Sequence, residues 1–292
     1  HIEAAISLKS IFPLAWFMKG EILIKKSDHR FEDDTLIANI IECFDNALSM
    51  ESYSIPPSRT TQTIALSWKA TLLMEQDREK ENFEHVISHI NKALALSDDF
   101  MSALLLIKKG IFQYYYSQYD NCLVSLKSAF SKFDEISSEK VTFPEHIATI
   151  RNMKGIVYYK QKRFQQALEE YNQAIFNLEP SDEVIDLLFL QGVYSNKGLL
   201  YTSTGQYQEA LDLYSQVDTV AKLQELQRKG GSLQHMWVNP SLTLYRMARK
   251  EEAFNRASGH QIPYEGINFL FSENKIYLAF LGATEFFATY FL

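Results

Sequence analysis

The sequence predicts an all-α protein built from repeated helical hairpins, and three observations support this fold class. Gly 11 and Pro 7 in 292 residues are too few for an all-β chain that needs a special turn about every ten residues. An apolar content of 46% is enough to bury a sizeable core. Most importantly, the chain resembles itself at a spacing of about 43 residues, and such periods are typical of repeat architectures.

The two clearest copies of the repeat begin at Ala148 and Tyr194 and align on Gly155 and Gly198. Chance agreement at so many spaced positions is improbable, so the similarity indicates a structural repeat. Counted from the glycine, the shared positions are an aromatic three on (Tyr158, Tyr201), an aromatic nine on (Phe164, Tyr207), Ala-Leu at twelve and thirteen (Ala167, Leu168, Ala210, Leu211), Tyr sixteen on (Tyr171, Tyr214) and a small apolar residue nineteen on (Ala174, Val217).

Four further copies follow the same pattern with decreasing fidelity. The equivalents of the glycine, which we call anchors, lie at 20, 70, 110, 155, 198 and 241, so their spacings are 50, 40, 45, 43 and 43 residues. The first copy contains a longer insertion that includes Glu32, and the sixth copy has Lys250 where the turn aromatic should be. We therefore expect about six hairpins.

Each copy contains two amphipathic helical patterns, because its apolar and small residues recur at three and four. The first helix runs through the anchor and the second through the Ala-Leu pair. Small residues at both places let the helix backbones approach closely, and the aromatics fill the space around the crossing. Gly205 can adopt the left-handed conformation that ends a helix, whereas Lys162 makes the same turn less easily.

With these motifs, the chain resembles the tetratricopeptide-repeat family over about residues 13 to 260, with a repeat of about 43 residues as in its longer-repeat members. The resemblance implies an α-solenoid with a right-handed superhelix, whose first helices line a concave groove for peptides or partner helices. We expect residues 1–260 to form the solenoid and residues 261–292 to form a C-terminal apolar capping helix region. This organisation predicts a protein-interaction module without enzymatic activity.

Composition and charge indicate which kinds of partner and which cellular compartment to expect for this protein. A net charge of −7 without a long basic run disfavours nucleic acid as a partner. Cys43 and Cys122 are expected to be buried thiols of a cytoplasmic protein, since they lie far apart in apolar patterns. The N-terminus does not resemble a signal peptide, and we expect the chain to be part of a longer protein. The apolar segment 276–292 is expected to pack against protein, including a partner or a missing domain, rather than to insert into a membrane.

The groove implied by the resemblance provides the candidate binding residues. In grooves of this family, asparagine amides hold the backbone of an extended ligand, which favours Asn152 and Asn196; the alternative is that both are solvated or cap a helix. The tyrosines are candidates for stacking on a ligand, although a helical aromatic stripe is also typical of a core. The recurrent lysine before each anchor is expected to seek solvent. The predicted partner-binding residues are Tyr114, Tyr115, Asn152, Tyr159, Lys160, Asn196, Tyr245 and Arg246.

Other functions have weaker support in the sequence. The family's carboxylate clamp for chaperone C-termini is disfavoured, because Asn152 and Asn196 are offset relative to their anchors. His85 and His89 could face a metal ion, but no third ligand accompanies them, and we expect both to be exposed. No nucleotide-binding or hydrolase motif is present, so no cofactor is expected. The alternative to an interaction module is a ligand-sensing domain of a larger regulator, or a secreted effector whose DNA-binding or catalytic part lies elsewhere.

Overall fold

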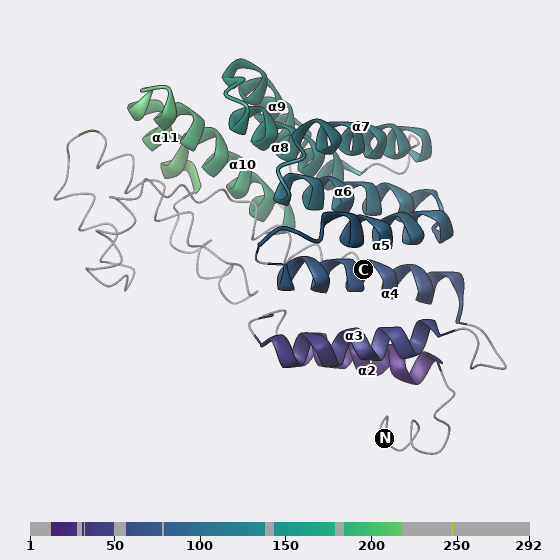
Figure 1. Cartoon of the computed structure of the whole chain (residues 1–292). Helices are drawn as coiled ribbons and strands as arrows, with labels where there is room; N and C mark the ends of the chain where they lie inside the picture. The colour runs from purple at the N-terminus through teal and green to yellow at the C-terminus, as the bar shows by residue number, and fades with distance from the viewer. Residues whose placement is uncertain are drawn as a thin grey trace. The chain divides into compact units, whose positions relative to one another are not determined.

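A computed structural model describes residues 13–27, 31, 33–49, 57–77, 79–137, 143–178, 184–217 and 247, with the side chains of 184–189, 191, 216 and 217 left out of the account. Within these ranges the secondary structure is helical, without a strand (Figure 1). The helices pair as antiparallel hairpins, and each hairpin packs against the next one within its unit. The predicted all-α fold of hairpins in series is therefore confirmed.

The chain divides into two units, of which the first contains three hairpins. Each first helix carries an anchor, and each second helix carries the apolar pair that the repeat predicts. Asp33, Ser58 and Asp98 cap three of these helices by accepting a backbone N–H in the first turn. The hairpins are α2 (Pro13–Lys26) with α3 (Asp34–Leu48), α4 (Arg59–Gln76) with α5 (Phe83–Leu96), and α6 (Asp99–Tyr115) with α7 (Tyr119–Ile136).

The second unit contains the two clearest copies of the repeat. They form the hairpins α8 (Pro144–Lys160) with α9 (Phe164–Leu178) and α10 (Val184–Ser203) with α11 (Tyr207–Val217). Helix α10 packs against both helices of the preceding hairpin. Its anchor residues therefore lie next to those of α8, one repeat earlier.

Close contact between the two helices of a hairpin depends on glycine at the anchor. A β-carbon added to Gly155 would overlap the ring of Tyr171 and lie 2.7 Å from its Cδ1. A β-carbon on Gly198 would lie 2.5 Å from Cε1 of Tyr214. Since real β-carbons do not come this close to other atoms, these glycines are needed for the tyrosines to pack, as the repeat pattern predicts.

The turns inside the four described hairpins after the first use one residue in the left-handed backbone region. In the three later hairpins this residue lies seven positions after the anchor: Ser117 has φ 60°, Lys162 has φ 60° and Gly205 has φ 83°. The next residue closes the helix end, as when the Arg163 N–H donates to the Tyr158 carbonyl at 2.8 Å. The predicted left-handed turns at Gly205 and Lys162 are both present, and the lower cost of this conformation at glycine stays a prediction.

Parts of the predicted organisation fall outside the described residues. These parts are the sixth hairpin and the apolar segment 276–292, and the boundary near residue 260 stays a prediction. In the described part of the chain, no helix combines the length and the hydropathy that crossing a membrane requires.

Candidate functional site

The face that the first helices form in each unit is the candidate site. In the second unit, two polar pairs connect the first helices α8 and α10. The Nδ2 atom of Asn196 donates to Oδ1 of Asn152 at 2.9 Å, and the hydroxyls of Tyr159 and Ser203 lie 2.7 Å apart. Each pair connects α10 to α8 across 44 residues, which is one repeat. The two pairs are therefore equivalent links between successive first helices.

Burial shows how these residues are used. Asn196 is 1% exposed, Asn152 is 8% exposed and Tyr159 is 9% exposed. Both side chains are buried and hydrogen-bonded to each other, so the solvated alternative does not describe this pair. The contact uses the carbonyl oxygen of Asn152 and leaves the two N–H donors of its amide for other partners. Lys160 follows Tyr159 and is exposed.

The predicted tyrosines of the first unit lie at the end of α6. Tyr114 and Tyr115 are both half-buried, and the ring of Tyr114 lies 5.8 Å from that of Tyr119. The Tyr115 hydroxyl donates to the Asp77 carbonyl at 3.2 Å, and the Lys80 ammonium lies 4.5 Å from the centre of its ring. The structure thus brings Tyr115 together with the turn between α4 and α5, whereas Tyr114 packs against α7.

Asp77 organises that turn, a role that no motif in the sequence indicates. It is 5% exposed, accepts from the Tyr116 hydroxyl at 2.6 Å and accepts from the Asn82 backbone N–H at 2.7 Å. Burial raises the pKa of Asp77, but the hydrogen bonds from Tyr116, Asn82 and Glu81 outweigh it, so the pKa lies below its ordinary value. The carboxylate therefore stays charged and fixes the turn beside Tyr115.

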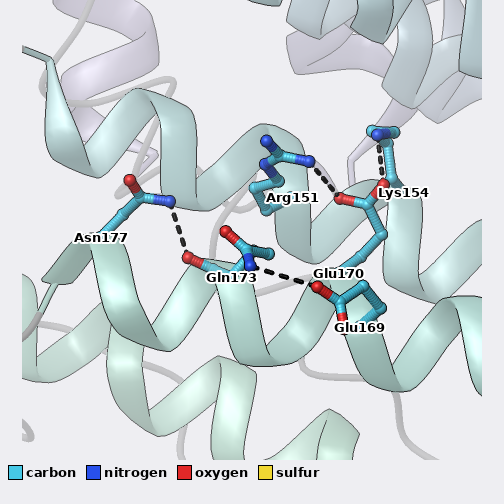
Figure 2. Close-up of polar contacts among 6 residues, drawn as sticks. All are labelled: Arg151, Lys154, Glu169, Glu170, Gln173 and Asn177. Atoms are coloured by element: carbon cyan, nitrogen blue, oxygen red, sulfur yellow. Dashed lines mark hydrogen bonds and ion pairs between the residues drawn. The ribbon is translucent and has the colours of Figure 1, made fainter.

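A second buried acid lies in the hairpin of α8 and α9. Figure 2 shows Glu170 between Arg151 and Lys154; the Arg151 guanidinium lies 3.0 Å from one carboxylate oxygen, and Lys154 binds the other. The side chain of Glu170 is 10% exposed, so both cations are held against α9. This cluster joins the two helices of one hairpin, and its charges are paired within the fold (Figure 2).

Three of the five recurrent lysines before an anchor pair with a second helix instead of seeking solvent, which corrects the expectation from the sequence at these positions. Lys154 binds Glu170, Lys69 binds Asp45 of α3, and the Lys109 ammonium donates to Asn91 Oδ1 at 2.8 Å. The side chains of Lys69 and Lys154 are only 12% and 21% exposed. Spacing alone could not reveal these partners, because they lie on different helices.

The structure describes the two cysteines and the two candidate metal-binding histidines, but not the last two predicted binding residues. Cys43 and Cys122 are buried, as predicted, and burial raises the pKa of the Cys122 thiol to about 12. The expectation that His85 and His89 are both exposed is wrong for His89, which is 7% exposed and packs its ring 4.9 Å from that of His85. Searching the described residues for three or more metal-binding side chains in one place finds no such group. Tyr245 and Arg246 lie outside the residues that the structure describes.

Comparison with known families identifies the class of protein. Residues 148–175 and 192–222 match the tetratricopeptide-repeat family model, and these segments form the hairpins of the second unit. These two hairpins are therefore tetratricopeptide repeats, as the repeat pattern predicted. The fold is that of a protein-interaction scaffold. A comparison with curated proteins found no match.

Solved structures share the fold at low sequence identity. BtubC (BKLC) from P. vanneervenii is 15% identical, with a TM-score of 0.56 over 85% of this chain and 88% of that one. The pilF protein of Pseudomonas aeruginosa is 17% identical, with a TM-score of 0.53 over 90% of this chain and 97% of that one. At such identities the likeness concerns the fold alone.

Proposed function

We propose that the chain is a non-catalytic interaction module that binds an extended peptide or a partner helix on the surface of its first helices. The polar pairs between α8 and α10 are the observation that carries this proposal. An interface that served packing alone would be filled with apolar side chains, because buried polar groups contribute little net stability even when they are paired. The two polar pairs between α8 and α10 are instead suited to hydrogen bonding with a ligand.

The chemistry of the second unit fits a peptide. The Asn152 amide offers two donors to a main-chain carbonyl, and Tyr159 offers a flat ring with a polar end. Lys160 is the next residue in sequence and is exposed. In this proposal its ammonium pairs with an acidic group of the peptide and so fixes the position of the peptide along the surface. The pair with Asn196 holds the Asn152 side chain in one orientation, so Asn196 acts as a positioning residue.

The first unit contributes aromatic surface. Tyr114 and Tyr115 are half-buried, so part of each side chain is open to a ligand, while Tyr119 supports Tyr114 and the α4–α5 turn supports Tyr115. Rigid tyrosines are favoured at interfaces because they bury much area at a small entropic cost. Tyr245 and Arg246 are proposed as further binding residues on the basis of the sixth copy of the repeat.

A pull-down with matched variants tests the proposal. Wild-type chain, an Asn152→Ala, Tyr159→Ala double variant and a Phe176→Ala control would each capture proteins from a lysate of the source cells for mass spectrometry. Phe176 lies on the second helix α9 with 75% of its side chain exposed, so it reports on the opposite helix layer of the repeat. Circular dichroism would first establish that each variant is folded.

The expected outcome is a protein that the wild type and Phe176→Ala retain and that the double variant loses. A partner that is lost from Phe176→Ala and kept by the double variant would place binding on the second helices and refute the proposal. The same conclusion follows if every variant retains every captured protein.

A further inference from the structure

The first helix of the first unit, α2, carries large apolar side chains that are open to solvent. Leu14, Met18 and Ile22 are 45%, 43% and 37% exposed, and they follow one another at intervals of four residues along one side of the helix. The other exposed residues of α2 are Lys25 and Lys26 in its last turn. We call Leu14, Met18 and Ile22 the α2 end face. A contiguous apolar surface of this kind marks an interaction site more often than single exposed apolar residues do.

Later repeats show which neighbour this side of a first helix contacts. The residue two positions before the anchor contacts the preceding first helix. Lys108 of α6 donates to Ser67 of α4 at 2.8 Å. Asn196 of α10 donates in the same way to Asn152 of α8 at 2.9 Å. Met18 has this position in α2, so the α2 end face lies on the side where a hairpin of this fold receives the hairpin before it.

The same side is buried where a hairpin does precede the first helix. In α4, Trp68 and Leu72 lie two positions before and two after the anchor and are 4% and 0% exposed. Helix α4 packs against α3 and α2 of the preceding hairpin. Met18 and Ile22 have the corresponding positions in α2 and are equally apolar, but α2 is the first helix that the structure describes (Figure 1). The α2 end face therefore has the composition of a helix-packing interface.

The lysines at the end of α2 indicate the charge of a helix that would cover this face. Consecutive helices of the first unit run in alternating directions, so a helix placed on α2 as α3 is placed on α4 would begin beside Lys25 and Lys26 (Figure 1). Burial raises the pKa of Glu21 and Lys25 opposes this shift, so one acid of α2 already lies near these two cations. An acidic first turn on the covering helix would add the second acid, and acids are favoured at that end of a helix.

A second copy of α2 does not supply this chemistry. The first turn of α2 contains no acidic residue, and an antiparallel copy would bring another pair of lysines to the interface. The observations therefore favour a different helix as the occupant of the α2 end face.

We propose that the α2 end face docks an amphipathic α-helix of another protein, which lies antiparallel to α2 and has acidic residues in its first turn. Apolar contacts with Leu14, Met18 and Ile22 provide the affinity, and the two lysines fix the direction of the helix. This site goes beyond the proposed function, because it uses other residues than the tyrosines and polar pairs assigned there.

The chain itself provides a probe peptide, because α3 packs on α4 and begins with Asp33 and Asp34. A peptide of residues 33–49 would be synthesised with Cys43→Ala, a fluorescent label and a hydrocarbon staple that joins two exposed positions one helical turn apart. A control peptide would carry Asp33→Lys and Asp34→Lys. Fluorescence polarisation would measure the affinity of both peptides for the full chain.

Matched variants of the full chain locate the binding. Val124 is 65% exposed on the second helix α7, so its replacement changes a comparable apolar side chain outside the α2 end face. Thermal melts would first establish that each variant is folded. The variants are Met18→Gln with Ile22→Gln, Lys25→Glu with Lys26→Glu, Val124→Gln, and Asn152→Ala with Tyr159→Ala.

The expected result is that the acidic peptide binds the wild type, Val124→Gln and the Asn152, Tyr159 variant with equal affinity. Its affinity for the Met18, Ile22 variant should be lower by about tenfold or more, because two apolar contacts are lost. The wild type should prefer the acidic peptide to the lysine peptide by about threefold, and the Lys25, Lys26 variant should reverse this preference.

Several outcomes would overturn the proposal. If neither peptide binds, or if the Met18, Ile22 variant binds as the wild type does, the α2 end face is not the site. Equal affinity for the two peptides in every variant would remove the acidic helix as its occupant. Sedimentation velocity without peptide would identify a second copy instead, if a wild-type dimer is lost in the Met18, Ile22 variant. A melting temperature far below that of Val124→Gln in this variant would show that the chain's own residues cover the face.

Discussion

Replacing Gly155 by alanine tests whether the anchor glycine exists to admit Tyr171. Three ring atoms of Tyr171 lie within 3.0 Å of an added β-carbon, and the tyrosine is 0% exposed, so the ring has no free space to move into. Overpacking of this kind costs up to about 3 kcal/mol. Alanine returns about 1 kcal/mol through its higher helix propensity, so the net loss should be about 2 kcal/mol.

The second hairpin supplies the matched background for this test. Its anchor is Ala70, and the residue in the position of Tyr171 is Ile90; both are 0% exposed. A β-carbon is thus accepted at the anchor where the partner position holds isoleucine. In a Tyr171→Ile background, Gly155→Ala should therefore stabilise the chain by about 1 kcal/mol, the helix-propensity gain alone.

Urea unfolding followed by far-ultraviolet circular dichroism would measure the four members of this cycle. The coupling between the two substitutions should be about 3 kcal/mol, at the upper end for residues in direct contact. Gly110→Ala is the control, because it faces Leu126 at 3.1 Å, and that flexible side chain can shift. Equal effects of Gly155→Ala in the two backgrounds would refute the proposed role of the glycine.

The turns and one buried histidine provide two further predictions. Lys162→Gly should stabilise the chain by about 0.5–1 kcal/mol by relieving the left-handed backbone, and Gly205→Ala should destabilise it by about 1 kcal/mol although no atom lies within 4 Å of the added methyl. Urea unfolding checks both, and shifts of the opposite sign would contradict the backbone argument. His146 is 4% exposed, and burial lowers its pKa to about 4, so between pH 6.5 and 4 the unfolded chain takes up a proton that the folded chain refuses. Stability that is fully present above pH 6.5 should then fall by about 3 kcal/mol in this window, and His146→Leu should remove that part of the pH dependence; an unchanged slope would exclude His146 as its source.

The sequence by itself determined the fold, because the apolar and small residues that pack a helical hairpin recur at fixed spacing within a short stretch of chain. Gly155 and Tyr171 lie in one hairpin, so the recurrence of the same pair at Gly198 and Tyr214 predicts the contact that the structure contains. The turn at Gly205 is local for the same reason. Each of these features is decided by residues within about one repeat of one another.

Only the tertiary structure decided what the first-helix surface offers. The spacing placed Asn152 and Asn196 near one face, but their hydrogen bond and their burial depend on how closely α8 and α10 approach. Lys108 directly precedes Lys109 in sequence, yet its ammonium donates to Ser67 of α4 whereas that of Lys109 donates to Asn91 of α5. Contacts between successive repeats depend on the angle and separation of helices, which a linear pattern does not specify.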